Sequence, residues 1–304
     1  MNDTKGPLAS NEQWSIVVLV VAVALAGILY RLVTLGRLEQ TSLLFIGIPA
    51  VLAIVVALSP KAESTTGSIL KGITIALLLS GVLLGEGFIC IVMASPLFYL
   101  VGLFVGWAIT ASRKKHNATL SCVLFILAPM SLEGVTPWLS FSRDETVQAS
   151  QIVNASTADV ERALARSPRT DLPLPAYLRM GFPRPVQAFG TGLAAGATRT
   201  IHFAGGEGKP GDLILRVEQS QPGFVHFAVV ADHSKIAHWL DWNSSDVTWT
   251  ALDPRHTQVI WTIHFQRRLD PAWYFSPWER YAVRLAANYL IRANATPTSS
   301  ERKE

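Results

Sequence analysis

The chain has 304 residues, of which 50% are hydrophobic and only 16% are charged, and its net charge is +4. A soluble domain carries about 25% charged residues, so this composition excludes a disordered chain and a coiled coil and differs from that of an ordinary soluble enzyme. With only two cysteines, the chain is also not a disulfide-stapled miniprotein.

The charges are unevenly placed along the chain. Residues 1–140 hold 8 of the 26 Lys and Arg residues and 6 of the 22 Asp and Glu residues. The chain therefore consists of an apolar part, 1–140, followed by a water-compatible part, 141–304. No dense basic stripe of the kind that binds a phosphate backbone is visible, so the sequence predicts no nucleic-acid partner.

The apolar part contains five segments that approach the roughly 20 apolar residues of a membrane-spanning helix. The last segment is the weakest, because it contains Pro129 and Glu133. Glu86 lies between two glycines, which predicts a turn between helices, whereas the alternative is a functional carboxylate inside one longer helix. We predict transmembrane helices over 14–35, 42–59, 69–85, 88–111 and 118–138.

The Lys and Arg residues in the predicted loops indicate an orientation, because cytoplasmic loops are enriched in them. With five spans, one side collects Lys5, Lys61, Lys71 and the run 113–115, and the other collects Arg31 and Arg37. This predicts a cytoplasmic N-terminus and an extracytoplasmic C-terminal part. If 118–138 does not span, the C-terminal part is cytoplasmic instead.

The residue pattern of the water-compatible part predicts mainly β-strands. Segment 145–154 alternates as a strand does, Ser156 and Asp159 have the spacing of a helix N-cap, and 172–182 predicts one or two helical turns. Clusters of Gly, Pro, Asp and Asn then separate a series of alternating segments, which is typical of an antiparallel meander. The six strands predicted there are 185–190, 196–204, 211–219, 223–231, 246–252 and 257–267.

A long amphipathic helix closes the chain. The sequence Ser276-Pro277-Trp278-Glu279 supplies an N-cap, a proline at the first helical position and a glutamate three residues after the cap. Apolar residues then recur at helical spacing through Ala293. This pattern places Trp278, Tyr281 and Leu285 on the buried face and Glu279 on the exposed face.

The order of elements and several short motifs resemble the START-like (SRPBCC) superfamily of polyketide cyclases and lipid-transfer domains. The motifs are Val147–Val153 running into Asn154-Ala-Ser156, and Gly196-Ala-Thr-Arg199. The whole chain is similar to membrane-anchored bacterial members of the superfamily, through Glu86, Gly87, Cys90, Met93, Pro96, Leu269–Phe275 and Arg280–Val283.

The resemblance implies a fold for each part of the chain. We predict about five transmembrane helices in 1–140 and an α+β helix-grip domain in 141–295, in which a curved antiparallel sheet wraps a long C-terminal helix. Residues 296–304 are predicted to form a disordered tail.

The resemblance also implies a cavity for an apolar ligand between the sheet and the long helix. Strand parity selects the side chains that face it, and the alternative is that they only fill a core. Among these side chains an inward Arg199 requires an acidic partner or an anionic ligand, such as a carboxylate or a lipid headgroup, unless it lies at the rim beside an Asp. The candidate cavity residues are Arg199, Ile201, Phe203, Val225, Phe227, Trp239, Trp249, Trp261, Phe265, Tyr281 and Leu285.

No catalytic residue, metal site or cofactor is predicted. His202, His226 and His264 lie on three strands, but their parity places them on the outer face of the sheet. No nucleophile-elbow motif is present in the sequence.

The first hypothesis is a protein of the bacterial inner membrane whose START-like domain binds or transfers a hydrophobic, lipid-like molecule at the membrane surface. Membrane lipids and a hydrophobic small molecule are the expected partners, and the sequence identifies no protein partner. One alternative is an enzyme of polyketide-cyclase type, although the residues favour a binding protein. The other is a structural or partner-binding membrane protein with a filled core.

Overall fold

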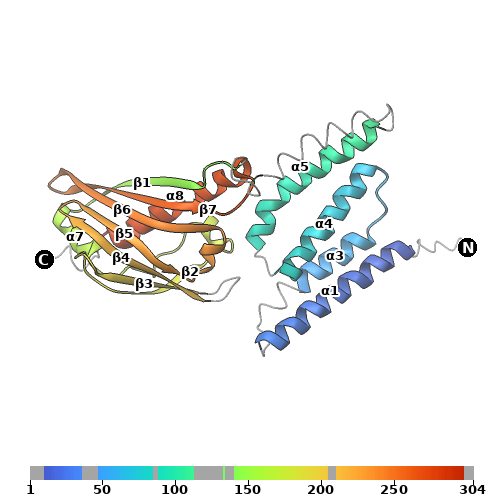
Figure 1. Cartoon of the computed structure of the whole chain (residues 1–304), viewed down its shortest axis with the longest axis horizontal. Helices are drawn as coiled ribbons and strands as arrows, with labels where there is room; N and C mark the ends of the chain where they lie inside the picture. Colours follow the sequence, from blue (N-terminus) through green and yellow to red (C-terminus); the bar gives the residue numbers. More distant parts are fainter. Residues whose placement is uncertain are drawn as a thin grey trace, which may run out of the picture. The chain divides into compact units, whose positions relative to one another are not determined.

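The computed structural model of the chain describes residues 10–35, 47–84, 88–112, 133, 140–204 and 210–297. The chain forms two compact units, Met1–Pro129 and Met130–Glu304, which are described separately (Figure 1). Glu86 and most of the expected fifth span, 118–138, lie outside the described residues, as do residues 298–304 of the expected tail.

The described part of the first unit is helical. The chain runs through α1 (Asn11–Leu35), α3 (Ile48–Leu58), α4 (Thr65–Leu84) and α5 (Phe88–Ser112). Along the chain, α1 packs against α3, α3 against α4, and α4 against α5. Lys71 of α4 donates hydrogen bonds to the carbonyl oxygens of Ala57 and Ser59, at 3.2 and 2.8 Å, so its ammonium caps the C-terminal end of α3.

The sequence predicted five membrane spans, but among the described residues only two helices qualify as candidate spans. Only Asn11–Leu29 and Ile91–Ala111 are long and apolar enough to cross a membrane. The apolar helices Ile48–Leu58 and Thr65–Gly81 are shorter. At 1.5 Å per residue, the 11 residues of Ile48–Leu58 extend about 16 Å, which is half of the roughly 30 Å hydrocarbon core.

Glycines allow α4 and α5 to approach closely. A Cβ atom on Gly106 would lie 2.9 Å from the backbone Cα of Thr66, and one on Gly102 would lie 2.3 Å from the Ile73 side chain. These two glycines are four residues apart on α5, the small-xxx-small spacing by which helices pack in membranes. The hydroxyls of Thr74 and Tyr99 join the same helices with a 2.8 Å hydrogen bond.

The second unit contains a seven-stranded antiparallel sheet in the order β1-β7-β6-β5-β4-β3-β2. The first strand of the unit thus pairs with the last one, whereas β2 to β7 follow one another across the sheet in chain order. The strands are β1 (Asp144–Val153), β2 (Arg184–Phe189), β3 (Thr198–Ala204), β4 (Gly211–Gln221), β5 (Phe224–Asp232), β6 (Leu240–Asp253) and β7 (His256–Arg267).

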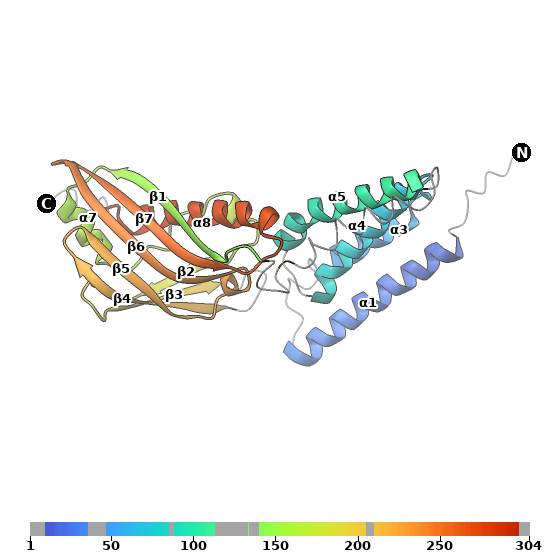
Figure 2. The ribbon, with the colours of Figure 1, turned by 45° about the horizontal axis from the view of Figure 1, so that its top comes forward.

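The sheet curves around one long helix, α8 (Ala272–Asn294), which packs against β1 and β7 (Figure 2). The short helix α7 (Thr157–Leu164) begins at Ser156, whose hydroxyl accepts the amide hydrogen of Asp159, as the spacing predicted. The expected turns in 172–182 are a short 3-10 helix over Tyr177–Arg179. A curved antiparallel sheet that wraps a C-terminal helix is a helix-grip fold, which confirms the architecture expected for this part of the chain.

Strand parity is confirmed in the core. Val259, Trp261, Ile263 and Phe265 of β7 all point inward and are nearly inaccessible to solvent. They join inward residues of β1, β4, β5 and β6, together with α7 and α8, in one hydrophobic cluster. The alternation of the sequence therefore identified the inner face correctly, because successive strand residues point to opposite faces.

Two expectations about elements are wrong. The sixth strand in the chain begins at Leu240, six residues before the predicted start at residue 246, because its first residues pair with the end of β7. The long helix begins at Ala272 and contains Pro277. The residue before its start, Pro271, has no side chain that could cap it. The predicted cap at Ser276 is therefore replaced by a start one turn earlier, where the Glu133 carboxylate accepts a 3.1 Å hydrogen bond from the Ala272 amide.

The faces at the start of α8 are also reversed from those predicted. Glu279 is buried, whereas Trp278 and Tyr281 are 38% and 51% exposed. Further along the helix Tyr289 and Ala293 are buried as predicted, while the fully buried Ala287 and Ile291 lie outside the predicted face. The reversal is therefore confined to the first turns of the helix.

Candidate functional site

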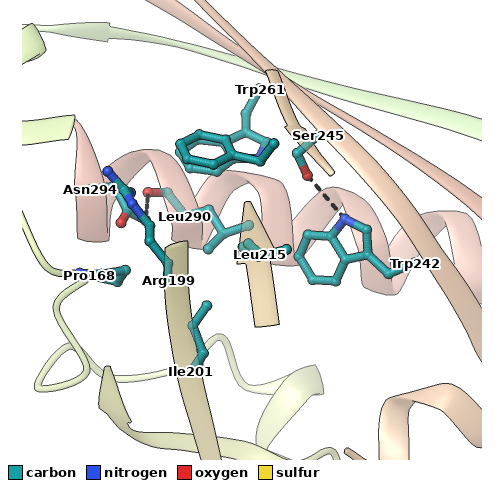
Figure 3. Close-up of a pocket in the computed structure, with 10 residues that line it drawn as sticks. Pro168, Arg199, Ile201, Leu215, Trp242, Ser245, Trp261, Leu290 and Asn294 are labelled. Carbon is teal, nitrogen blue, oxygen red and sulfur yellow. Dashed lines mark hydrogen bonds between the residues drawn. The ribbon is translucent and has the colours of Figure 1, made fainter. Parts of the chain in front are cut away.

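A small cavity lies between the inner face of the sheet and α8 (Figure 3). Its free volume is about 20 Å³, which is room for a single water-sized group. Strands β3 to β7 and α8 supply nine of its lining residues, and the loop after α7 supplies the tenth. They are Pro168, Arg199, Ile201, Leu215, Phe227, Trp242, Ser245, Trp261, Leu290 and Asn294.

Among the described residues, Arg199 is the only ionisable one that lines this cavity. It points inward from β3, as strand parity predicted, and is only 2% exposed. Its Nη2 atom donates to the carbonyl oxygens of Leu164 and Gly192, and the guanidinium lies 4.8 Å from the centre of the Phe227 ring. Within the described part of the chain, no carboxylate forms an ion pair with it, so the alternative of a rim position beside an Asp is wrong.

Burial lowers the pKa of the Arg199 guanidinium to about 10, from its ordinary value of 12.5. Desolvation is the cause, because removal from water disfavours the charged form. At neutral pH the side chain nevertheless carries a positive charge that backbone carbonyls and one aromatic face balance only in part.

The loop before β3 brings backbone carbonyls to this arginine. Gly190 has a φ of +95°, and a Cβ atom there would lie 2.1 Å from the carbonyl oxygen of Thr198. The loop can therefore lie close to β3 only with glycine at this position. The Gly192 amide donates to the carbonyl oxygen of Ala165, 2.6 Å away, which ties the loop to the end of α7.

Three buried polar atoms of the cavity lining have no hydrogen-bond partner among the described residues: Nε of Arg199, Nε1 of Trp261 and Oδ1 of Asn294. They come from β3, β7 and α8 (Figure 3). Two of them are donors and one is an acceptor. Because an unsatisfied buried polar group costs about 1–3 kcal/mol, this concentration at one small cavity favours a polar occupant.

Apart from Ser245, the rest of the lining is apolar, and part of it is not fully buried. Trp242 and Leu290 are only partly buried, and the Trp242 indole nitrogen donates to the Ser245 hydroxyl, 3.0 Å away (Figure 3). An occupant larger than water must displace such side chains, because the cavity as it stands is nearly filled.

The predicted cavity residues separate into three groups in the structure. Arg199, Ile201, Phe227 and Trp261 line the cavity. Phe203, Val225, Trp249 and Phe265 are buried in the packed core without lining it. Trp239, Tyr281 and Leu285 also lie outside the lining; Trp239 is buried against the Phe182 ring, while Tyr281 is exposed.

The predicted set lacked six of the ten lining residues: Pro168, Leu215, Trp242, Ser245, Leu290 and Asn294. The helical pattern contains a signal for Asn294, because this residue lies one position beyond Ala293 on a buried stretch of α8. Ser245 shares strand parity with the inward Val247 and Trp249, but the predicted strand began only at residue 246. Trp242 reaches the same cavity because a β-bulge between Trp242 and Ser244 shifts the register, and the residue pattern gave no sign of that bulge.

A buried ionic cluster lies at the start of α8. Arg267 is fully buried and bonds the carboxylates of Asp270 and Glu133, at 2.5 and 3.3 Å. Its guanidinium also donates to the carbonyl oxygens of Ser142, Phe141 and Leu269. Glu133, placed by the sequence analysis in a membrane span, is thus bound to the second unit.

Glu279 lies near this cluster, and burial raises the pKa of its carboxyl to about 7. The backbone of Leu269 and Arg268 and the charge of Arg267 oppose that rise, and the charge of Glu145 adds to it. Neither carboxylate oxygen has a hydrogen-bond partner among the described residues. Glu279 does not line the cavity beside Arg199.

The histidines form a polar row on the outer face of the sheet. Asp246 bridges His226 and His264, at 2.6 and 2.9 Å, and the other ring nitrogen of His264 lies 3.1 Å from the Thr146 hydroxyl. His202 pairs separately with Asp212. Among the described residues, no group of three His, Cys, Asp or Glu side chains is arranged to hold a metal ion.

The chain matches no protein-family model and no curated protein. Solved structures resemble about half of it. A START superfamily protein from Mycobacterium smegmatis is 12% identical over 49% of this chain and 92% of its own, with a TM-score of 0.33. The Zhui aromatase/cyclase from Streptomyces sp. R1128 is 15% identical over 50% and 86%, with a TM-score of 0.30.

A third solved structure, the Aha1 dimer from Colwellia psychrerythraea, is 14% identical over 49% of this chain and 96% of its own, with a TM-score of 0.30. The structural neighbours thus include START-superfamily and aromatase/cyclase proteins. The helix-grip assignment itself rests on the strand order of this chain and on the packing of α8.

Proposed function

We propose that this protein is a membrane-anchored helix-grip domain that binds an apolar molecule bearing one acidic group. The acidic group would be held by Arg199, and the apolar body would lie between the sheet and α8. Anchoring is supported by the two helices that are long and apolar enough to cross a membrane. A tether of this kind would keep the domain near the bilayer, where apolar molecules are concentrated.

The observation that carries the proposal is that the Nε atom of the buried Arg199 has no hydrogen-bond partner among the described residues. The same is true of Nε1 of Trp261 and Oδ1 of Asn294, which line the same cavity. A buried charge is stable when it is paired, and a carboxylate can accept hydrogen bonds from Arg199 and Trp261 together. A group that also carries a hydroxyl could donate to the Asn294 oxygen. The cavity lining thus complements a small polar head attached to an apolar body.

Photolabelling of the full chain in amphipol tests the proposal. Two probes share one diazirine-bearing ten-carbon chain, and one ends in a carboxylate while the other ends in a hydroxyl. We expect the acid to label peptides of β6 or α8 near Trp242 and Leu290. Arg199→Gln should weaken competition by unlabelled decanoate about 10- to 100-fold, as expected for the loss of a charge-assisted hydrogen bond, and should leave labelling by the alcohol unchanged.

Arg216→Gln is the matched control, because Arg216 lies on the neighbouring strand and is exposed. Equal responses of the two variants, or equal labelling by acid and alcohol, would contradict the role of Arg199. Labelling outside the cavity would contradict the site itself.

The small free volume favours a second candidate function, in which the core is filled and the domain presents a surface to a protein partner. If neither probe labels the protein, the result supports this second candidate function, a filled core with a surface for a protein partner. A cyclase reaction receives no such support, because acid–base chemistry needs a second titratable group and Arg199 is the only ionisable residue in the lining.

A further inference from the structure

Aromatic side chains cluster at the start of α8 and on the segment beside it. Within the helix, Tyr274 contacts the rings of Trp273, Phe275 and Trp278, with centroids 5.0–6.5 Å apart. One turn later, Tyr281 contacts Tyr177, which begins a further chain of ring contacts. We name this surface the aromatic face; it consists of Trp273, Tyr274, Phe275, Trp278, Tyr281 and Tyr177.

Three members of the aromatic face are exposed to an extent that is costly in water. Trp273, Trp278 and Tyr281 are 47%, 38% and 51% exposed, although they are among the largest apolar side chains of the domain. Glu279, between them in sequence, is buried. The helix therefore turns aromatic rings outward and a carboxyl inward, the opposite of what water favours, which indicates a surface made for a different contact.

The aromatic face lies where the polypeptide enters the domain. The Glu133 carboxylate accepts a hydrogen bond from the Ala272 amide, which is the first residue of α8. Phe141 is 65% exposed, and its carbonyl oxygen accepts a 2.9 Å hydrogen bond from Arg267. In the sequence, the fifteen residues 118–132 directly before Glu133 carry no charge. The start of α8 is thus hydrogen-bonded to Glu133, the residue that directly follows this uncharged stretch in the sequence.

The polar side chains around this end are Arg–carboxylate pairs. Arg143 pairs with Asp270 and Arg280 pairs with Glu145, each with a distance of 2.6 Å. Trp and Tyr rings among paired charges are the composition of the interfacial layer of membrane proteins, where an apolar ring body and a polar edge meet lipid headgroups. The bilayer is favoured over a second protein surface by the uncharged stretch that precedes Glu133 in the sequence and by the two helices long and apolar enough to cross a membrane.

We propose that the aromatic face docks into the headgroup layer of the lipid bilayer, with Trp273, Trp278 and Tyr281 as the inserting side chains. This proposal rests on the membrane anchoring of the proposed function but does not depend on ligand binding at Arg199. Docking would hold the start of α8 against the membrane, so the end of the domain at the β6–β7 hairpin would face away from it.

The hairpin supplies a matched reference position. Leu252 lies near the end of β6 and is 53% exposed, comparable to the aromatic residues. The 12-residue strand β7 runs from this hairpin to Arg267. At about 3.3 Å per residue, the two ends are therefore about 35 Å apart, more than the thickness of a headgroup layer.

Depth-dependent fluorescence quenching tests the docking. In the full chain with Cys90→Ser and Cys122→Ser, a single Trp278→Cys variant is labelled with an environment-sensitive dye and reconstituted into phosphatidylcholine vesicles with or without headgroup-labelled nitroxide lipid. We expect at least a two-fold stronger quenching at position 278 than at a Leu252→Cys control. Trp273→Cys provides an independent second position if the first variant does not fold.

Quenching at 278 and 273 equal to that at 252 would overturn the docking. So would quenching that appears only when labelled and quencher-labelled protein copies are mixed, since this identifies a second copy of the chain as the occupant. Extraction of the chain from vesicles by alkaline carbonate would contradict the membrane anchor, whereas loss of photolabelling concerns only the Arg199 site.

Discussion

The two units of this protein place their apolar side chains in opposite ways. In the first unit, large residues such as Leu25 and Leu29 of α1 are about 60% exposed, while Ala53 and Ala57 fill the helix contacts. In the second unit, large residues such as Leu213 and Phe265 are buried in the core between the sheet and the helices. Large residues outside and small ones at the contacts are what the proposed membrane anchoring predicts for the first unit, whereas the second unit has the buried apolar core that the hydrophobic effect produces.

This difference means that one kind of substitution has different consequences in the two units. Water drives apolar side chains into the core of the second unit, so its stability depends on buried volume and on complete pairing of its buried charges. Helix contacts in the first unit depend on close approach instead. The predictions below use matched residues to separate these two sources of stability.

Removal of the buried arginine at the start of α8 should have the largest effect. Arg267→Met leaves the buried Glu133 without its cation and Asp270 with only Arg143, so we expect the free energy of unfolding of the second unit to fall by about 3–5 kcal/mol. Hydrogen exchange of β7 peptides in the full chain measures this change. Arg268→Met is the control, because its pair with Asp241 is exposed and should contribute less than about 1 kcal/mol; equal effects would contradict the cluster.

A pair of identical truncations compares the interiors of the two units. Leu213→Ala empties a fully buried position and should lower the free energy of unfolding by about 3–4 kcal/mol. Leu25→Ala removes the same atoms from an exposed position in α1 and should change helix packing little. Denaturant unfolding in micelles, followed by exchange of β4 and α1 peptides, distinguishes them. A large loss from Leu25→Ala would show that α1 is packed against protein.

The buried carboxyl of α8 predicts a pH dependence. The pKa of Glu279 is about 7 in the fold and 4.5 ordinarily, so the folded state opposes ionisation. Stability should therefore fall as pH rises from about 4.5 to 7, by up to about 3 kcal/mol. Glu279→Gln should remove this loss, stabilising the protein at pH 8 and changing little at pH 5. Thermal unfolding at both pH values tests this, with the exposed Glu218→Gln as control.

Two glycine substitutions test close approach in the first unit. Gly106→Ala places a Cβ atom 2.9 Å from the backbone of Thr66 and should destabilise the α4–α5 contact by about 1–3 kcal/mol. Gly72→Ala meets nothing within 4 Å and should be neutral or slightly stabilising through helix propensity. Loss of helical circular dichroism during titration with sodium dodecyl sulfate ranks the variants, and a reversed ranking would exclude this packing.

Local patterns predicted much of the second unit. Alternation along β7 identified Trp261, Ile263 and Phe265 as inward, and the Ser156 cap identified the start of α7. The inward direction of Arg199 was also correct, since it follows from parity with Ile201. These successes share a cause: each depends on the chain's own geometry over a few residues, which the sequence encodes directly.

The sequence by itself determined the two-part composition, the alternating strands and the inward position of Arg199. Only the tertiary structure decided the start of α8, the burial of Glu279, the exposure of Trp278 and the pairing of Glu133 with Arg267. The physical reason is that these features arise where segments more than a hundred residues apart meet. A helical pattern indicates which residues share a face, but the neighbours supplied by the rest of the chain decide which face is buried.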